Sequence, residues 1–235
     1  KILKGKGFKA TAIKIDPYIN VDAGTMNPIE HGEVFVTDDG VECDQDVGHY
    51  ERFLNENLSR KNYLTSGQIY QEVLRKERAL AYNGKCVEAF PFLSDEIIRQ
   101  FKKVAGDNDF LVVELGGTVG EYQNIVFLET ARRLANQNPD TVCFVHLGYL
   151  PVPKHLGEMK TKPTQQSIVS LNSIGIRPDI VICRSEKLAD AIRRNAELTR
   201  TLSGERIQQE VVKLLGAPKP GSAFVMLSEL GVLAV

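Results

Sequence analysis

Three carboxylates in the sequence have the chemistry and the positions needed to bind a divalent cation. Asp44 and Asp46 lie close together in a polar segment, and Glu114 ends the apolar run FLVVE. Magnesium takes oxygen ligands and is usually bound through one or two carboxylates together with substrate phosphates. Glu114 is the better candidate because its run places it at the tip of a buried strand, whereas Asp44 by itself fits a solvated surface acid as well.

A lysine lies inside an apolar run near the beginning of the sequence. Lys14 belongs to FKATAIKI, residues 8–15. A buried ammonium is costly unless it reaches a carboxylate or a phosphate, so Lys14 is a candidate for binding an anionic ligand. The alternative is an edge residue whose long side chain carries its charge out to solvent. The sequence leaves both interpretations open.

Glycines follow the run that ends at Glu114. Gly116, Gly117 and Gly120 would let backbone amides approach an anionic group or the edge of a pyrimidine base. The same GGTVG sequence could instead form only a tight turn from a strand to a helix.

A basic run, KTKPTQ, precedes a predicted helix. Helix N-termini offer free N–H groups and the positive end of the helix dipole, and the two lysines add full charges. We therefore predict triphosphate binding here, with a solvated loop as the alternative. The residues of this run are Lys160, Thr161, Lys162, Pro163, Thr164 and Gln165.

The histidines and cysteines form no catalytic or metal-binding pattern. His146 lies in an apolar strand pattern and is interpreted as a hydrogen-bonded core residue, whereas His31 and His49 lie in a long polar segment and are better candidates for a functional role. No CxxC spacing occurs among the four cysteines, so we predict neither a disulfide nor a zinc site.

Parallel strands would bring the candidate residues together. Apolar runs separated by helical patterns predict an α/β fold with a doubly wound, mostly parallel sheet in a single domain. Ligands bind such sheets beyond the carboxyl ends of the strands, where Lys14 and Glu114 lie. Ser94 is expected to cap one of the helices and Gly106 to end it. The predicted strands cover residues 8–15, 110–113, 141–147 and 180–183, and the predicted helices residues 65–82, 94–105, 124–136 and 164–174.

The composition favours a soluble enzyme or binding protein over a nucleic-acid or membrane protein. The 235 residues are 43% hydrophobic, and 29 basic side chains nearly cancel 30 acidic ones. No general positive field therefore attracts nucleic acid or an anionic membrane, and an anionic substrate needs a local basic site. No apolar run approaches the roughly 20 residues that span a bilayer, and KILKGKG is no signal sequence. We predict a cytoplasmic location.

Six segments of the sequence together resemble the CTP synthase family, in its N-terminal synthetase (amidoligase) domain. The resemblance implies a fold like that of P-loop NTPases and of dethiobiotin synthetase. The segments are KIDPYINVDAGTMNPIEHGEVFVTDDG (14–40), DVGHYERF (46–53), SGQIYQEVLRKER (66–78), VELGGTVGEYQN (113–124), LGEMKTKPTQ (156–165) and SIGIRPDIVICRS (173–185).

The resemblance implies a carbon–nitrogen ligase of pyrimidine biosynthesis. ATP phosphorylates the uracil O4 of UTP, and ammonia then displaces the phosphate to give CTP. Asp46 and Glu114 match the acids that bind Mg²⁺ in the family, and Asp46 also matches an ATP contact. Lys14 matches the lysine that holds phosphates and stabilises the transferred group.

The resemblance also implies a pyrimidine-nucleotide site. Residues 160–165 match the run that binds UTP and, at an overlapping site, the feedback inhibitor CTP. A CTP-contacting Asp-Ile-Glu triplet of many members is replaced here by Glu121, Tyr122 and Gln123, which carry one charge fewer. Family members form homotetramers with this site at subunit boundaries, which would give the RKER sequence at residues 75–78 a role in the interface.

Parts of the family pattern are not found in these residues. A glycine-rich phosphate loop is expected before Ile2, and GKG at residues 5–7 does not replace it because it leads into a strand rather than following one. We expect residues 1–185 to be an N-terminally truncated synthetase domain and residues 186–235 a divergent C-terminal part of the same domain. The glutaminase domain (glutamine amidotransferase) that supplies ammonia is also missing, so ammonia would be free or come from a partner. Activity of these residues alone is expected to be weak or absent.

Two alternatives remain. The chain could be a non-catalytic module that binds UTP or CTP and oligomerises. It could also be another ATP-dependent ligase of the same fold, such as a relative of dethiobiotin synthetase, although the KTKPTQ and GHYERF sequences argue against this.

Overall fold

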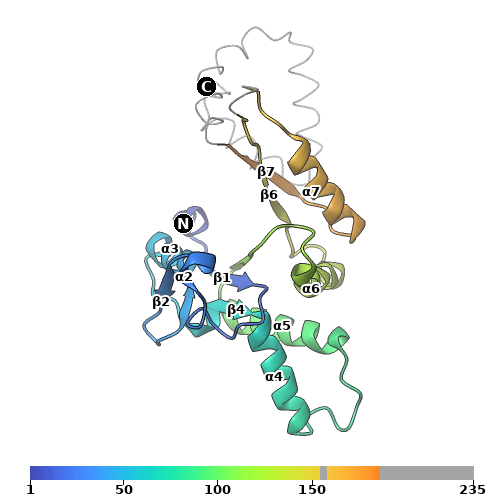
Figure 1. Ribbon diagram of the computed structural model, residues 1–235. Coiled ribbons are helices and arrows are strands. Elements are labelled where there is room, and N and C mark those ends of the chain that lie inside the picture. The colour runs from blue at the N-terminus through green and yellow to red at the C-terminus, as the bar shows by residue number, and fades with distance from the viewer. Residues whose placement is uncertain (154–157, 186–235) are drawn as a thin grey trace. The chain divides into compact units, whose positions relative to one another are not determined.

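The computed structural model describes residues 1–153 and 158–185 of the chain (Figure 1). The chain divides into two units, Lys1–Val142 and Cys143–Val235, which are described separately. The expected role of residues 186–235 lies outside the described residues.

A three-stranded parallel sheet forms the centre of the first unit. Its order is β4-β1-β5, with β1 at Ala10–Asp16, β4 at Tyr63–Thr65 and β5 at Phe110–Leu115. The central strand β1 is buried along its whole length, as expected for an apolar strand paired on both sides. The register sets Lys14 opposite both Tyr63 and Glu114, so the carboxyl ends of all three strands meet at one edge.

Helices cover the two faces of this sheet. On one face Ile13 and Ile15 of β1 pack in a hydrophobic cluster with residues of α4 (Ser66–Arg78), α5 (Ala89–Ala105) and α6 (Ile125–Gln137). Successive side chains of a strand point to opposite faces, so the intervening Lys14 points to the other face.

On the other face lie α3 (Gln45–Leu54) and an antiparallel hairpin of β2 (Val34–Val36) and β3 (Glu42–Asp44). A second hydrophobic cluster holds these elements together. Its buried members are Val41, Cys43, Val47, Leu58 and Tyr63. The short elements of the unit are α1 (Ile2–Gly5), α2 (Pro28–His31), η1 (Arg60–Asn62) and η2 (Tyr122–Asn124).

In its described residues, the second unit contains a parallel pair of strands and one helix. Its strands are β6 (Val145–Tyr149) and β7 (Ile180–Arg184), and α7 (Lys162–Ser173) packs against β6 through the buried residues Thr164 and Leu171. The predicted α/β class with parallel strands is therefore confirmed.

Two predicted element boundaries are wrong. The helix expected to start at Ser94 is part of α5 (Ala89–Ala105), whose regular helical backbone begins at Pro91 after the extended Phe90. Ser94 is buried within it, although Gly106 does end the helix. The strand expected at residues 141–147 runs instead over β6, because its pairing with β7 starts at Val145 opposite Ile180.

Two further observations concern the N-terminal residues and the helices. Residues 5–7 connect the end of α1 to the segment before β1, so they lead into a strand as expected.

Within the described ranges, no helix is long and apolar enough to cross a membrane.

Candidate functional site

Lys14 lies at the centre of the candidate site. It is only 5% exposed, and its ammonium forms ion pairs with the carboxylate of Asp46 and with Glu114, whose Oε1 lies 3.1 Å from Lys14 Nζ. The side chains of the two acids remain 37% and 42% exposed. The interpretation of Lys14 as a residue at a sheet edge does not apply, because β1 is the central strand. One buried cation thus brings two accessible carboxylates together.

Three elements position the side chains of Lys14, Asp46 and Glu114. Lys14 and Glu114 are paired across β1 and β5. Lys14 lies two residues before the end of β1, and Glu114 lies one residue before the end of β5. Asp46 is in the first turn of α3, whose N-cap is Asp44: the Asp44 Oδ1 accepts a hydrogen bond of 2.7 Å from the Asp46 backbone N–H. Asp44 is therefore a capping residue that fixes the start of α3 and with it the position of Asp46.

Two consecutive residues of α3 contact the same carboxylates. The Tyr50 hydroxyl donates a hydrogen bond to Glu114 Oε2, and His49 Nδ1 lies 3.6 Å from Asp46 Oδ1. Sequence reasoning favoured His49 over His146 for a functional role but missed Tyr50. The available signal was helical spacing, since Asp46 and Tyr50 are four residues apart on one helix and share a face.

Lys14 and Asp46 are both ionised at neutral pH. Burial by itself lowers the pKa of Lys14, but the hydrogen bond to Asp46 and the charges of Glu114 and Asp44 outweigh it and hold the pKa above its ordinary value. Burial would raise the pKa of Asp46, but the hydrogen bond and charge of Lys14 lower it. Burial and the contact with Glu114 raise the pKa of Tyr50, so its hydroxyl keeps its proton.

A buried carboxylate lies beside the cluster. Asp16 is 6% exposed, and its Oδ2 accepts hydrogen bonds from the hydroxyls of Tyr63 at 2.9 Å and Tyr18 at 3.1 Å. Burial raises the pKa of Asp16. A Cβ on Gly116 would lie 2.7 Å from Asp16 Oδ1 and 2.9 Å from the Ile15 carbonyl oxygen, so only glycine fits where the loop passes this strand end.

The glycine-rich loop leads to the triplet of Glu121, Tyr122 and Gln123. Gly117 has a φ of +81°, and a Cβ there would lie 2.8 Å from Glu121 Oε2, so the loop and Glu121 are in close contact. Gln123 Nε2 donates to the same oxygen at 2.7 Å, and Tyr122 is 85% exposed. The triplet is therefore accessible and adjoins the loop that follows Glu114.

The buried Asn124 side chain is hydrogen-bonded to this loop. Asn124 is 2% exposed, and its Nδ2 donates a hydrogen bond of 3.1 Å to the Thr118 carbonyl. The Asn124 Oδ1 is buried without a hydrogen-bond partner among the described residues.

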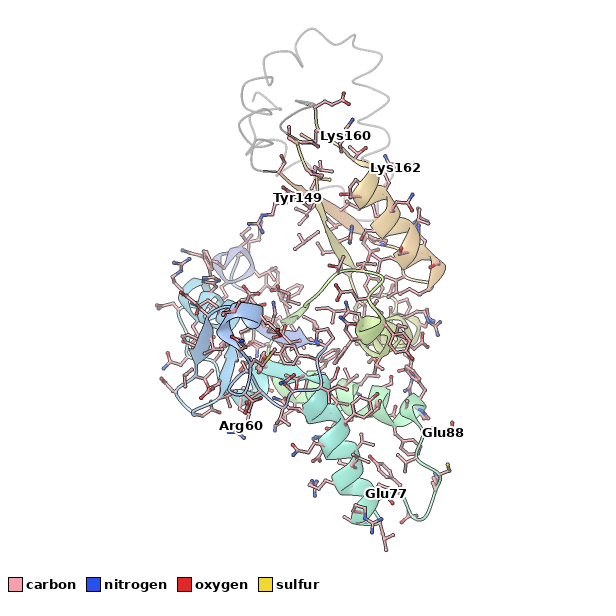
Figure 2. The ribbon with its side chains drawn as sticks, in the orientation of Figure 1. Arg60, Glu77, Glu88, Tyr149, Lys160 and Lys162 are labelled. Carbon is pink, nitrogen blue, oxygen red and sulfur yellow. The ribbon has the colours of Figure 1, made fainter. Side chains whose placement is uncertain are left out.

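The basic run lies in the second unit, at the start of α7. Lys160 forms an ion pair with Glu158, and Lys162 begins the helix (Figure 2). Thr164 is buried, and its Oγ1 donates to the Tyr149 carbonyl at 2.9 Å, which makes it a packing residue. The exposed residues of the run are Thr161, Lys162, Pro163 and Gln165. The predicted residues are thus divided between two units, with Lys14, Asp46, Glu114 and the triplet in the first.

His146 is buried in β6, as predicted, at 7% exposure. Its Nε2 has no hydrogen-bond partner in the described part of the chain, so the expected hydrogen bond is not found at that atom. Burial lowers its pKa, which keeps the imidazole neutral at pH 7.

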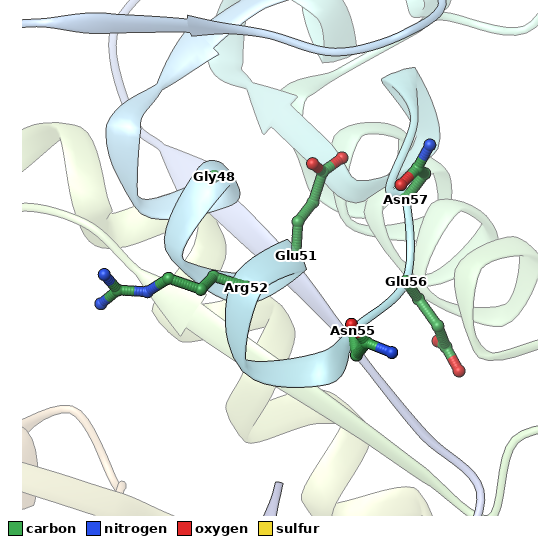
Figure 3. Close-up of a pocket in the computed structure, with 6 residues that line it drawn as sticks. All are labelled: Gly48, Glu51, Arg52, Asn55, Glu56 and Asn57. Atoms are coloured by element: carbon green, nitrogen blue, oxygen red, sulfur yellow. The ribbon is translucent and has the colours of Figure 1, made fainter.

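One pocket in the described residues is lined by none of the predicted site residues. It has a volume of about 350 Å³ at the end of α3, and Figure 3 shows Glu51 and Arg52 leaving the helix in different directions. A smaller pocket of about 170 Å³ is lined mainly by apolar residues and adjoins the site through Tyr50 and Glu114.

The donor set fits magnesium. No group of three or more His, Cys, Asp or Glu side chains in the described ranges is arranged to hold a metal ion by itself. Asp46 and Glu114, however, converge on a single cation, the Lys14 ammonium. Two carboxylates completed by phosphate oxygens and water are a usual ligand set for Mg²⁺.

Comparisons with known proteins agree on one family. The family model for the CTP synthase N-terminus matches residues 1–213, a range that includes part of the segment expected to diverge. The CTP synthase of Nautilia profundicola is 54% identical over 187 residues, which cover 79% of this chain and 34% of that protein. The CTP synthase of Pyrobaculum aerophilum is 52% identical over 81% of this chain and 36% of that protein. The CTP synthase of Pyrococcus horikoshii is 48% identical over 88% of this chain and 39% of that protein. The chain spans only slightly more than a third of the length of these relatives.

Proposed function

The chain belongs to the CTP synthase family, whose N-terminal region it matches, and we propose that its site serves the ATP-dependent amidation of UTP to CTP. The observation that supports this most directly is the cluster of Lys14, Asp46 and Glu114 at the carboxyl ends of two parallel strands. Phosphoryl transfer depends mainly on positioning and on stabilising charge, and this cluster offers a fixed cation and two accessible anions for that purpose.

We assign the residues of the cluster separate roles. Asp46 and Glu114 would hold Mg²⁺, which supplies charge neutralisation at the phosphates of ATP when it is bound. The Lys14 ammonium would contact the transferred phosphoryl group. Lys14 stays charged at neutral pH because neighbouring carboxylates raise its pKa, so it needs no proton from solvent for this role.

The exposed residues of the basic run are candidates for binding a pyrimidine nucleotide, and so, in the other unit, is the triplet at 121–123. Lys162 and the N-terminus of α7 provide positive charge for the UTP triphosphate, and CTP would compete for overlapping contacts. The accessible Tyr122 and the loop at Gly116–Gly120 suit the base. Homotetramer assembly belongs to the same proposal, and analytical ultracentrifugation with and without nucleotide tests it.

The experiment that tests the function is direct. The 235-residue chain is incubated with UTP, ATP, MgCl₂ and ammonium, and CTP is quantified by chromatography. We expect weak or no turnover, because residues 5–7 join a helix to a strand and do not form a phosphate loop. Rapid turnover would contradict this expectation.

Calorimetry separates the proposal from its main alternative. The proposal requires that Mg²⁺–ATP and UTP both bind, and that binding of Mg²⁺–ATP is lost in Asp46→Asn. If UTP or CTP binds while Mg²⁺–ATP does not, the chain is a non-catalytic pyrimidine-nucleotide module instead. If no pyrimidine nucleotide binds, the dethiobiotin-synthetase-like alternative is favoured.

A further inference from the structure

The carboxylate of Glu114 is engaged at both oxygens. Its Oε1 faces the Lys14 ammonium at 3.1 Å, and its Oε2 accepts the hydrogen bond from the Tyr50 hydroxyl. The Glu114 side chain is 42% exposed at the end of β5, so packing alone does not fix its torsion angles. The direction in which Oε1 points is therefore set by its two partners.

Tyr50 itself is held firmly. Its ring packs against the second hydrophobic cluster beside Val47, and the start of its helix is fixed by the Asp44 cap. The hydroxyl reaches from α3 to the end of β5, a contact between residues 64 positions apart in the sequence. A rigid aromatic ring with a polar tip is well suited to hold a carboxylate in one orientation.

We propose that Tyr50 is a positioning residue for the divalent cation: its hydrogen bond to Oε2 turns the other oxygen of Glu114 toward the point that Asp46 also faces. This inference rests on the proposed metal site. One turn of α3 would then control both ligands, since Asp46 binds from the helix directly and Tyr50 acts through Glu114. Outer partners of metal ligands commonly change metal affinity by about 10- to 100-fold when removed.

The test measures binding of Mn²⁺, as a probe for Mg²⁺, to the 235-residue chain by electron paramagnetic resonance of the free ion. Tyr50→Phe keeps the packed ring and removes only the hydroxyl. We expect its Kd for Mn²⁺ to rise about 10-fold. The matched control is Tyr70→Phe, which removes the hydroxyl of a partly exposed tyrosine on α4 and is expected to leave the Kd unchanged.

A double-mutant cycle separates positioning from a general structural effect. If Tyr50 acts through Glu114, adding Tyr50→Phe to Glu114→Gln will not weaken Mn²⁺ binding beyond the loss that Glu114→Gln causes alone. A full additional loss in that background overturns the proposal, as does an unchanged Kd in the single Tyr50→Phe variant. If the unmodified chain binds no Mn²⁺, the metal site itself is refuted and this inference falls with it.

Discussion

At the residue scale, Lys14 is the side chain on which the proposed site depends most. Its ammonium contacts both carboxylates that are proposed to bind the metal, so it competes with the metal for them while attracting the phosphates of the nucleotide. The interaction energy of two unit charges 4 Å apart is about 4 kcal/mol at the effective dielectric constant of a protein surface. Removing the lysine charge must therefore affect metal and nucleotide in opposite directions.

Lys14→Met is accordingly expected to bind Mn²⁺ alone about tenfold more tightly, a change of about 1.4 kcal/mol. The same variant is expected to bind Mg²⁺–ATP more weakly. Electron paramagnetic resonance measures the first effect and calorimetry the second. Lys14→Arg keeps the charge and serves as the control. Weaker Mn²⁺ binding by Lys14→Met would show that the ammonium supports the metal site instead of competing with it.

Gly116 offers a second test at this scale. A Cβ there would meet the Ile15 carbonyl oxygen at 2.9 Å, and backbone cannot move aside cheaply. Gly116→Ala should therefore lower the free energy of unfolding by about 1–3 kcal/mol in urea titrations. Gly5→Ala, where nothing lies within 4 Å, should not lower it. Equal stability of the two variants would mean that the loop has room to shift.

The sequence predicted the charged residues of this site better than the residues that hold them in place. Lys14 and Glu114 were predicted because ligands bind beyond the carboxyl ends of parallel strands. The structure brings them together with Asp46, although their roles in binding remain predictions. The capping role of Asp44 depends on where α3 starts, and the role of Tyr50 on a contact with a distant strand. Helical spacing places Tyr50 on the same face of α3 as Asp46, but its contact with Glu114 is not encoded in a local pattern.

At the scale of elements, a buried carboxylate joins α4 to α5. Glu96 of α5 is 3% exposed and contacts Lys76 of α4 at 2.6 Å, together with Arg99 and Gln100 of its own helix. Burial alone would raise the pKa of Glu96, but the hydrogen bonds to Arg99 and Lys76 lower it from 4.5 to about 2. Its ionised form therefore stabilises the packing of the two helices.

The pH dependence follows from the sign of this shift. A folded-state pKa below the unfolded value gives stability that is present above about pH 4.5 and is lost as the pH falls toward 2, in total roughly 3 kcal/mol. Glu96→Gln should be less stable than the unmodified chain at pH 7, and urea titrations should show this difference shrinking between pH 4.5 and 2. A difference that stays constant over that range would rule out the ionised Glu96 as its source. Glu77→Gln, on α4 at a partly exposed site, is the control.

Element boundaries were predicted less well than element types. The SDE sequence at residues 94–96 resembles a helix start, but the regular helical backbone already begins at Pro91, after the extended Phe90. Proline is favoured at the first helical position, so this signal was present in the sequence. The start of β6 could not be read locally, because pairing with Ile180 determines it.

At the scale of the whole molecule, the proposed ligand contacts are divided between two units of the chain. The metal and Lys14 contacts belong to the first unit, and the basic run at residues 160–165 belongs to the second. The sequence predicted both sets as parts of one site in a single domain. The α/β class is confirmed, whereas the single domain, with residues 186–235 as its divergent part, remains a prediction.

This division has a measurable consequence for binding. Lys162 is exposed at the first turn of α7, and a charge-assisted hydrogen bond to a phosphate contributes about 1.5–3 kcal/mol. Lys162→Ala should therefore weaken UTP binding at least about tenfold in calorimetry. Its Mn²⁺ affinity should not change, because the metal ligands belong to the other unit. Lys61→Ala, an exposed lysine in η1, should alter neither quantity. Unchanged UTP affinity in Lys162→Ala would remove the basic run from the nucleotide site, and a loss of Mn²⁺ affinity would show that the metal site depends on the second unit.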